Sequence, residues 1–269
     1  MKTPTGRSLA SSLLLAFCLT PVASEAAVLV GYVNMSPTTA VNLTSVGSVN
    51  WATWNYVSGD SGASIAPSDK KNVGLVSGNA GFIGSAARVG SASNTTIRGG
   101  NASTMRFSYT DGTTTTTPVS NQATKMVFPN ALDSANQGVS LTVTGDVGQT
   151  YLVSVWAAGL SGQGKMTATL NGATTIELFS QLYGDNGGDT LKSSTLFTFE
   201  FRPDNAAHLL NLSYILSTDT PDDPLVTGVQ NGNSHVGITA VAVSLIPEAS
   251  TSFSLIAGLG ILGLLRRRV

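Results

Sequence analysis

The stretch Thr195-Leu-Phe-Thr-Phe-Glu-Phe201 indicates the fold most directly. Successive side chains of a β-strand point to opposite faces, so this alternation places the phenylalanines on one face and Thr198 and Glu200 on the other. Leu141-Thr-Val-Thr144 has the same alternation. Such a pattern is typical of antiparallel strands that bury one face.

A hairpin signal lies between these two stretches. Met166 to Leu170 and Thr174 to Phe179 flank Asn171-Gly172, a dipeptide that favours the two-residue turn of a β-hairpin. We expect the two segments to pair as antiparallel strands.

More strand-like segments recur between Gly, Asn, Asp and Pro residues, and helical periodicity is nearly absent. These segments are Val28 to Val33, Val49 to Val57, Thr104 to Tyr109, Val139 to Thr144, Tyr151 to Ala157, His208 to Leu216 and His235 to Leu245. Many short strands predict an all-β fold. We expect an antiparallel, jelly-roll-like β-sandwich rather than a barrel with an enclosed lumen.

Two regions have a different composition. Gly59 to Gly100 contains scattered Gly, Ser and Asn and predicts long loops with short strands. Asp111-Gly112, followed by a threonine tract and Pro118, predicts a turn. No repeat and no charge-rich linker interrupts the chain, so we predict one β-sandwich domain over residues 27–245.

The charge balance limits the possible partners. Of the 14 basic residues five lie in the terminal segments, and of the 15 acidic residues two do, which leaves residues 27–246 with a net charge of about −4. This balance excludes a basic nucleic-acid footprint. Charged residues make up only 11% of the chain, so neutral polar side chains must supply its solubility.

The first 26 residues predict a secretory signal peptide. Lys2 and Arg7 precede an apolar run over Leu9 to Leu19, and cleavage after Ala26 would place Ser24 and Ala26 at the two positions that must be small. A lipoprotein signal at Cys18 is the alternative, but Phe17 stands where a small residue is needed. Because Cys18 is the only cysteine, the mature chain would have neither a disulfide nor a catalytic thiol.

Residues 246–269 predict a second sorting segment. Pro247 and Glu248 precede an uncharged apolar run, Phe253 to Leu265, and Arg266, Arg267 and Arg268 follow it. Thirteen helical residues rise about 20 Å, and a start nearer Pro247 approaches the roughly 17 residues of a short membrane span. A last helix of the domain core is the alternative, but the run has no polar face. We predict a short C-terminal transmembrane helix with its arginines in the cytoplasm.

This tail resembles the PEP-CTERM sorting signal of Gram-negative bacteria, although Ala249 stands where that family usually has a second proline. The resemblance implies recognition of Pro247 and Glu248 by an exosortase, a membrane-embedded cysteine protease. It also implies an inner-membrane-anchored precursor and a mature protein at the cell surface or outside the cell.

A second resemblance supports the fold. Several segments look like an extracellular β-sandwich module that accompanies PEP-CTERM tails and is similar to galactose-binding-like jelly rolls. They are Val49 to Trp54, Asp69 to Lys71, Arg106 to Gly112, Tyr151 to Trp156 and Val236 to Val243. The resemblance implies an extracellular polysaccharide as a partner.

Catalytic candidates are sparse. Glu177 and Glu200 are the two glutamates of the domain, and neither has an acidic neighbour at a known catalytic spacing. His208 and His235 lie near no Gly-x-Ser-x-Gly turn. We predict solvent-facing glutamates and strand-edge histidines, and therefore no enzyme activity.

Binding candidates are Trp51 and Trp54, whose rings would stack on a sugar if exposed. Residues i and i+3 of a strand point to opposite faces, so at most one would belong to a flat platform, and the alternative is a place in the core. We predict no cofactor and keep a structural calcium ion as the alternative, because loop carboxylates supply suitable oxygen ligands. These carboxylates lack the spacing of a known calcium loop, and Asp is an ordinary turn residue. The candidates are Asp185, Asp189, Asp222 and Asp223.

Together these features predict an exported structural or adhesive protein of the cell surface or extracellular matrix. A carbohydrate-binding module of the jelly-roll type is the main alternative, and a secreted hydrolase is the third.

Overall fold

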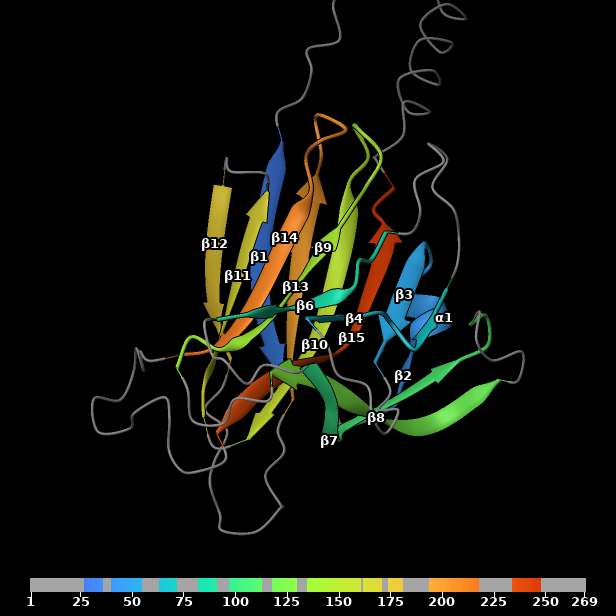
Figure 1. Ribbon diagram of the computed structural model, residues 1–269. Coiled ribbons are helices and arrows are strands. Elements are labelled where there is room, and N and C mark those ends of the chain that lie inside the picture. Colours follow the sequence, from blue (N-terminus) through green and yellow to red (C-terminus); the bar gives the residue numbers. More distant parts are fainter. Residues whose placement is uncertain are drawn as a thin grey trace, which may run out of the picture.

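Strands dominate the computed structural model of the chain (Figure 1). The structure describes residues 27–35, 40–54, 63–71, 82–90, 97–112, 118–129, 135–160, 162–170, 174–180, 194–217 and 234–247. Within these ranges every element is a strand except the single-turn helix α1 (Leu43–Val46). The fold is all-β, as predicted.

The larger sheet has nine strands. β3 (Asn50–Thr53) pairs with its central strand β15 and with β5 (Asp69–Lys70). All described pairs are antiparallel except β2 with β7. The main path of the sheet runs in the order β1 (Val28–Met35), β13 (Ser194–Arg202), β10 (Tyr151–Leu160), β15 (His235–Leu245), β8 (Val119–Pro129), β7 (Ile97–Tyr109) and β2 (Val41–Asn42).

The smaller sheet has six antiparallel strands and faces the viewer in Figure 1. Its order is β12 (Thr174–Phe179), β11 (Gly164–Leu170), β14 (Leu210–Leu216), β9 (Gly138–Val143), β6 (Ala86–Val89) and β4 (Ser64–Ile65). The expected pairing of β11 with β12 is confirmed, from Lys165 opposite Phe179 to Leu170 opposite Thr174. Asn171 and Gly172 lie outside the described residues.

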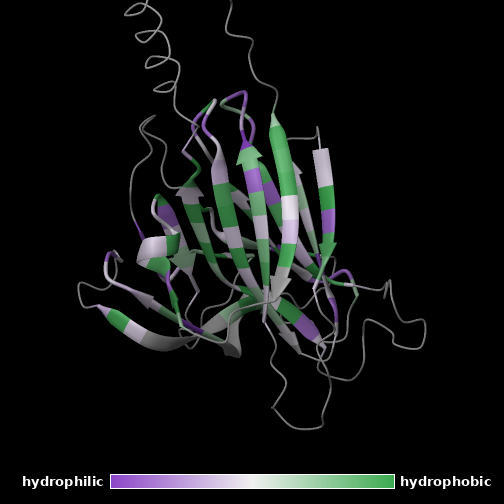
Figure 2. Cartoon of the chain, turned by 180° about the vertical axis from the view of Figure 1, so that it is seen from behind, coloured by the Kyte–Doolittle hydropathy of each residue, from purple (hydrophilic) through white to green (hydrophobic). Residues whose placement is uncertain are grey.

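The main hydrophobic core lies between the two sheets. Phe197, Phe199 and Phe201 of β13 are fully buried in it, whereas Thr198 and Glu200 alternate with them on the outer face. Seen from behind, hydrophobic and hydrophilic residues alternate along many of the strands (Figure 2). Burial of each large apolar side chain contributes about 1.5–3 kcal/mol, so this layer stabilises the stacking of the sheets.

A second apolar cluster covers the outer face of the larger sheet near β15. It includes Trp51, Phe107 and Trp156, whose indole meets the Phe107 ring edge-on at 5.5 Å between ring centroids. Ala240 and Ala242 of β15 belong to this cluster, and their neighbours Val241 and Val243 belong to the main core. The strand is therefore covered on both faces, which explains why its sequence does not alternate.

Each strand expected from the sequence is present. Thr174 to Phe179 and His235 to Leu245 have the expected ends, and the other strands have altered ends. Within the expected strand Val49 to Val57, β3 covers Asn50–Thr53 and Trp54 lies beyond its end. Residues 55–57 are outside the described chain. The strand expected from His208 begins at Leu210, after a turn in which the His208 N–H donates to the Asn205 carbonyl at 2.9 Å.

Some elements were not predicted. β8 contains the polar run Ser120-Asn-Gln-Ala-Thr124, which lacks strand alternation, and it forms by pairing with the long strand β7. Helix α1 has a single turn, which is too short for a periodic signal.

The two terminal segments lie outside the description. This concerns residues 1–26 and the expected transmembrane helix Phe253 to Leu265. No helix in the described part of the chain is long and apolar enough to cross a membrane.

We predict that Phe199→Ala lowers the free energy of unfolding by about 3–5 kcal/mol, because it removes a fully buried ring from the layer between the sheets. Urea unfolding of the full chain, compared at constant m-value, measures this change. Thr198→Val, one residue away on the outer face, is the control and should stay within about 0.5 kcal/mol. Equal losses in both variants would contradict the assignment of this core.

Candidate functional site

Neutral polar side chains gather on the outer face of the six-stranded sheet. Leu170, Leu212 and Leu141 point into the core from β11, β14 and β9. Because side chains alternate along a strand, their sequence neighbours on the same strands face outward. We call this outward set the polar face. It consists of Ser140, Thr142, Thr167, Thr169, Asn211 and Ser213.

Strand register arranges the polar face in two rows. In the first row Thr169 lies opposite Asn211, and Asn211 lies opposite Thr142. In the second, Thr167 lies opposite Ser213, and Ser213 lies opposite Ser140. Neighbouring strands are about 4.8 Å apart, so each row presents a polar group at about that spacing across three strands.

A hollow of about 310 Å³ lies over the polar face. Ser85 and Ala87 line it at the β6 margin, where Ala87 lies opposite Ser140. Gly84 leaves room beside Thr142, because a Cβ at this position would lie 2.8 Å from the threonine Oγ1. Small residues along this margin thus keep the hollow open.

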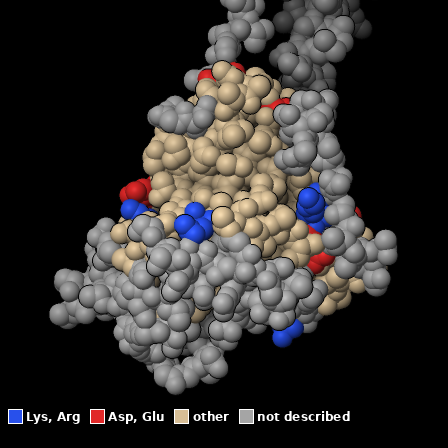
Figure 3. Space-filling view, in the orientation of Figure 1, with Lys and Arg blue, Asp and Glu red and all other residues tan. Residues whose placement is uncertain are grey.

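Charged residues stay at the margins of this face. All the described residues that line the hollow are neutral. Figure 3 shows a broad uncharged area in the orientation of Figure 1, with charged atoms around it. Lys165 and Glu177 face outward on β11 and β12 and form an ion pair at 3.2 Å between Nζ and Oε1. The hollow therefore offers hydrogen bonds without a net charge.

Both tryptophans proposed for sugar stacking are buried. Trp51 is 0% and Trp54 1% exposed, and they lie in the second cluster and in the main core, respectively. The expectation that i and i+3 point to opposite faces is confirmed. Neither ring has the exposure that sugar stacking requires, and both take the alternative place in the core, because the larger sheet is covered on both faces at β3. Neither ring has a free face on which a sugar could stack.

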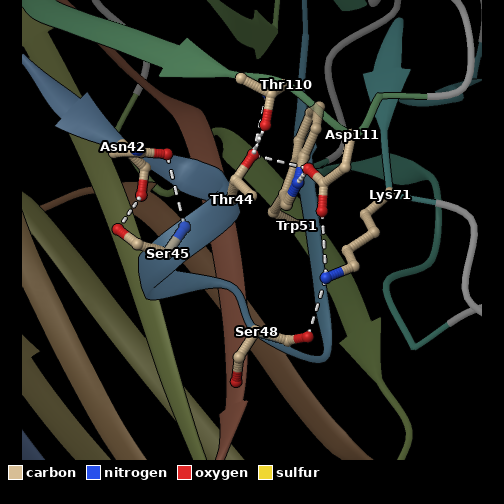
Figure 4. A network of polar contacts seen from close by, with 8 residues as sticks. All are labelled: Asn42, Thr44, Ser45, Ser48, Trp51, Lys71, Thr110 and Asp111. Carbon is tan, nitrogen blue, oxygen red and sulfur yellow. Dashed lines mark hydrogen bonds and ion pairs between the residues drawn. The ribbon is translucent and has the colours of Figure 1, made fainter.

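Trp51 instead takes part in a polar network around Asp111 (Figure 4). The Trp51 Nε1–H and the Thr44 hydroxyl donate to Oδ1 of Asp111 at 2.9 and 2.7 Å. Lys71 forms an ion pair with Oδ2 at 3.0 Å and donates to the Ser48 carbonyl at 2.8 Å. The network joins α1, β3, the residue after β5 and a residue just after β7.

Asp111, at the centre of this network, and Asp69, beside it, have different surroundings. Partial burial raises the pKa of Asp111, but the hydrogen bonds from Thr44 and Trp51 and the Lys71 ammonium outweigh it and hold the pKa below its usual 3.8. Asp69, on β5, is buried and accepts a hydrogen bond from the Tyr109 hydroxyl at 2.8 Å. The Trp51 and Tyr109 rings pack together with their centroids 4.4 Å apart. Both carboxylates thus bind side chains that hold β3 and β7 in place.

The two glutamates considered for catalysis do not face a common site. Ile176 and Leu178 pack against the core, so Glu177 points outward from the smaller sheet. Glu200 lies between two core phenylalanines and points outward from the larger sheet. The core therefore separates the two carboxylates.

The histidines are held by different contacts. Nδ1 of His208 contacts Oδ1 of Asp204 in the turn before β14. His235 is buried, and its ring stacks on Phe128 with 4.5 Å between centroids. These contacts give both side chains a structural role.

The calcium candidates and most of the sorting motif fall outside the described residues. Asp185, Asp189, Asp222 and Asp223 lie there, as do Glu248, Arg266, Arg267 and Arg268, and their roles stay predictions. Among the described residues no three His, Cys, Asp or Glu side chains cluster as a metal site would require. Pro247 is described and exposed, directly after β15.

Sequence reasoning missed the polar face. Its signal is the recurrence of Thr, Ser or Asn two residues apart, as in Thr167 and Thr169 or Asn211 and Ser213. Such pairs are common in a chain of this composition. Only the strand register shows that three of them lie side by side.

Comparison with known proteins gives little guidance. No family model matches the chain, and no curated protein matches it. Among solved structures, the chain is similar to the enzymatically active domain of tailspike protein 4 of bacteriophage CBA120, at 12% identity and a TM-score of 0.35. The similarity covers 60% of this chain and 19% of that chain. A TM-score this low assigns neither a fold nor an activity.

We predict that Asp111→Asn lowers the free energy of unfolding by about 1–2 kcal/mol at pH 7, because it weakens hydrogen bonds to an ionised acceptor. A carboxylate with a lowered folded-state pKa stabilises the fold above its unfolded pKa of about 3.8 and loses this effect as pH falls through the folded value. The difference between wild type and variant should therefore shrink below about pH 4.

Urea unfolding of both proteins between pH 2.5 and 7 measures this dependence. Asp146→Asn, in the loop after β9, serves as the reference substitution. A gap between wild type and Asp111→Asn that is the same at pH 7 and pH 2.5 would argue against the charge-dependent network.

Proposed function

We propose that the chain is an exported, non-enzymatic protein of the cell surface or extracellular matrix, with a jelly-roll-like β-sandwich that acts in adhesion. The observation that carries this proposal is the polar face, a hollow lined with neutral hydrogen-bonding groups. The separation of Glu177 from Glu200 and the structural contacts of the histidines also favour binding over catalysis.

The positions of the first and last strand ends support the proposal that the domain lies between an N-terminal and a C-terminal sorting segment. β1 runs antiparallel to β13, β13 to β10, and β10 to β15. The start of β1 and the end of β15 therefore lie at the same end of the sheet, uppermost in Figure 1. The proposed cleavage site after Ala26 and the motif at Pro247 and Glu248 adjoin these two strand ends.

This arrangement suits a tethered precursor. A membrane anchor after Pro247 would hold the domain by one end, and the opposite end would point away from the membrane. An exosortase-like protease would then reach the sorting motif beside the sheet end without unfolding the domain. The inner membrane is a transient partner in this proposal, and the mature protein is outside the cell.

A carbohydrate-binding module is the second candidate. The hollow favours it, because neutral hydroxyl and amide groups are suited to binding sugars. In this second proposal the carbohydrate binds to the polar face and not to Trp51 or Trp54.

We predict that Glu248→Ala, or deletion of Arg266 to Arg268, leaves the protein in the membrane fraction with an unprocessed C-terminus. The physical reason is the loss of a carboxylate that the protease recognises, or of the charges that keep the tail end in the cytoplasm. Intact-mass measurement of the protein from exporting cells shows both ends, and the wild type should begin at Ala27.

The matched control is Glu177→Ala, which removes one carboxylate on the domain surface and should leave processing unchanged. A wild-type protein that remains in the cytoplasm with Met1 or Lys2 at its N-terminus would refute export. Normal processing of both tail variants would refute the sorting motif.

A further inference from the structure

The polar face carries hydroxyls that the protein itself does not use. The hydroxyls of Thr142, Thr167 and Ser213 make no hydrogen bond within the described part of the chain. By contrast, the Thr169 hydroxyl lies 3.2 Å from that of Thr175. A ligand in the hollow would therefore meet free donors and acceptors in both rows.

The chemistry of these groups indicates the class of ligand. A hydroxyl both donates and accepts. The Asn211 amide already donates to the Leu209 carbonyl at 3.4 Å and adds one further donor and one acceptor. No cation lies among the described lining residues to balance a carboxylate, sulfate or phosphate. A ligand with many neutral hydroxyls satisfies this surface, whereas an anionic ligand would lose hydration without an opposite charge in return.

The geometry favours a chain over an isolated sugar. The two rows cross three strands, so polar groups extend over about two strand spacings of roughly 4.8 Å each. The hollow has the volume of a small-ligand site, and the small residues of the β6 margin widen it. A linear glycan lying across the strands would contact both rows along its length.

We propose that the polar face binds a neutral polysaccharide across β11, β14 and β9. The inference rests on the proposed function, because it requires the domain to be exposed to extracellular glycans. The hydroxyls of Thr142, Thr167 and Thr169 and the side chains of Asn211 and Ser213 hydrogen-bond to sugar hydroxyls. Ala87 leaves space for the rings at the margin.

The test is an array of neutral hexose oligosaccharides and uronic-acid oligosaccharides, probed with the purified full chain. A variant with Thr142→Val, Thr167→Val and Thr169→Val keeps β-branched side chains of similar shape and removes the hydroxyls. We expect its affinity for the neutral glycans that bind the wild type to fall at least tenfold. Ala87→Leu, which fills the hollow and removes no polar group, should cause a similar loss.

Thr198→Val on the outer face of the larger sheet is the matched control and should bind like the wild type. Urea unfolding of each variant shows whether its fold is intact. Unchanged affinity in the folded triple variant would overturn the proposal. Binding to uronic-acid oligosaccharides alone, or no binding by the wild type, would overturn it too.

The two proposals fail in different ways. Cell fractionation reports export independently of the array. Exported protein that binds no neutral glycan refutes the polar face as a glycan site and leaves the sorting proposal standing. Protein that stays in the cytoplasm but binds through the polar face refutes export and supports the site.

Discussion

Burial of β15 on both faces is the constraint on which the rest of the structure depends. Its valines fill the layer between the sheets, and its alanines lie under the second apolar cluster with Trp51 and Trp156. Alanine is small enough to let these indoles approach the sheet. One central strand thus joins two hydrophobic clusters, and the chain needs no disulfide in its described part to hold them together.

The same constraint decides which surfaces are available for binding. Most aromatic side chains of the described sheets are buried in the interior. The Trp51 N–H also donates a hydrogen bond to Asp111. The smaller sheet has only one apolar face, so its outer face is free to carry hydroxyls and amides. The proposed binding surface is therefore the face that the core does not require.

The polar network around Asp111 holds the short elements α1, β3 and β5 in position. The single-turn helix α1 and the short strands β3 and β5 have few backbone hydrogen bonds of their own. Side chains of Thr44, Trp51 and Lys71 converge on one carboxylate and connect these short pieces to the end of β7. A few charged groups thus position segments that strand pairing alone would hold weakly.

The sequence alone determined the all-β class, the pairing of β11 with β12, and the inward face of β13. These features depend on neighbours along the chain, on the Asn171-Gly172 turn signal and on the period of two in Phe197 to Phe201. It did not show β8, the burial of both Trp51 and Trp54, or the rows of the polar face. Only the tertiary structure decided these features, because strand register and the covering of a second sheet face depend on residues far apart in the sequence.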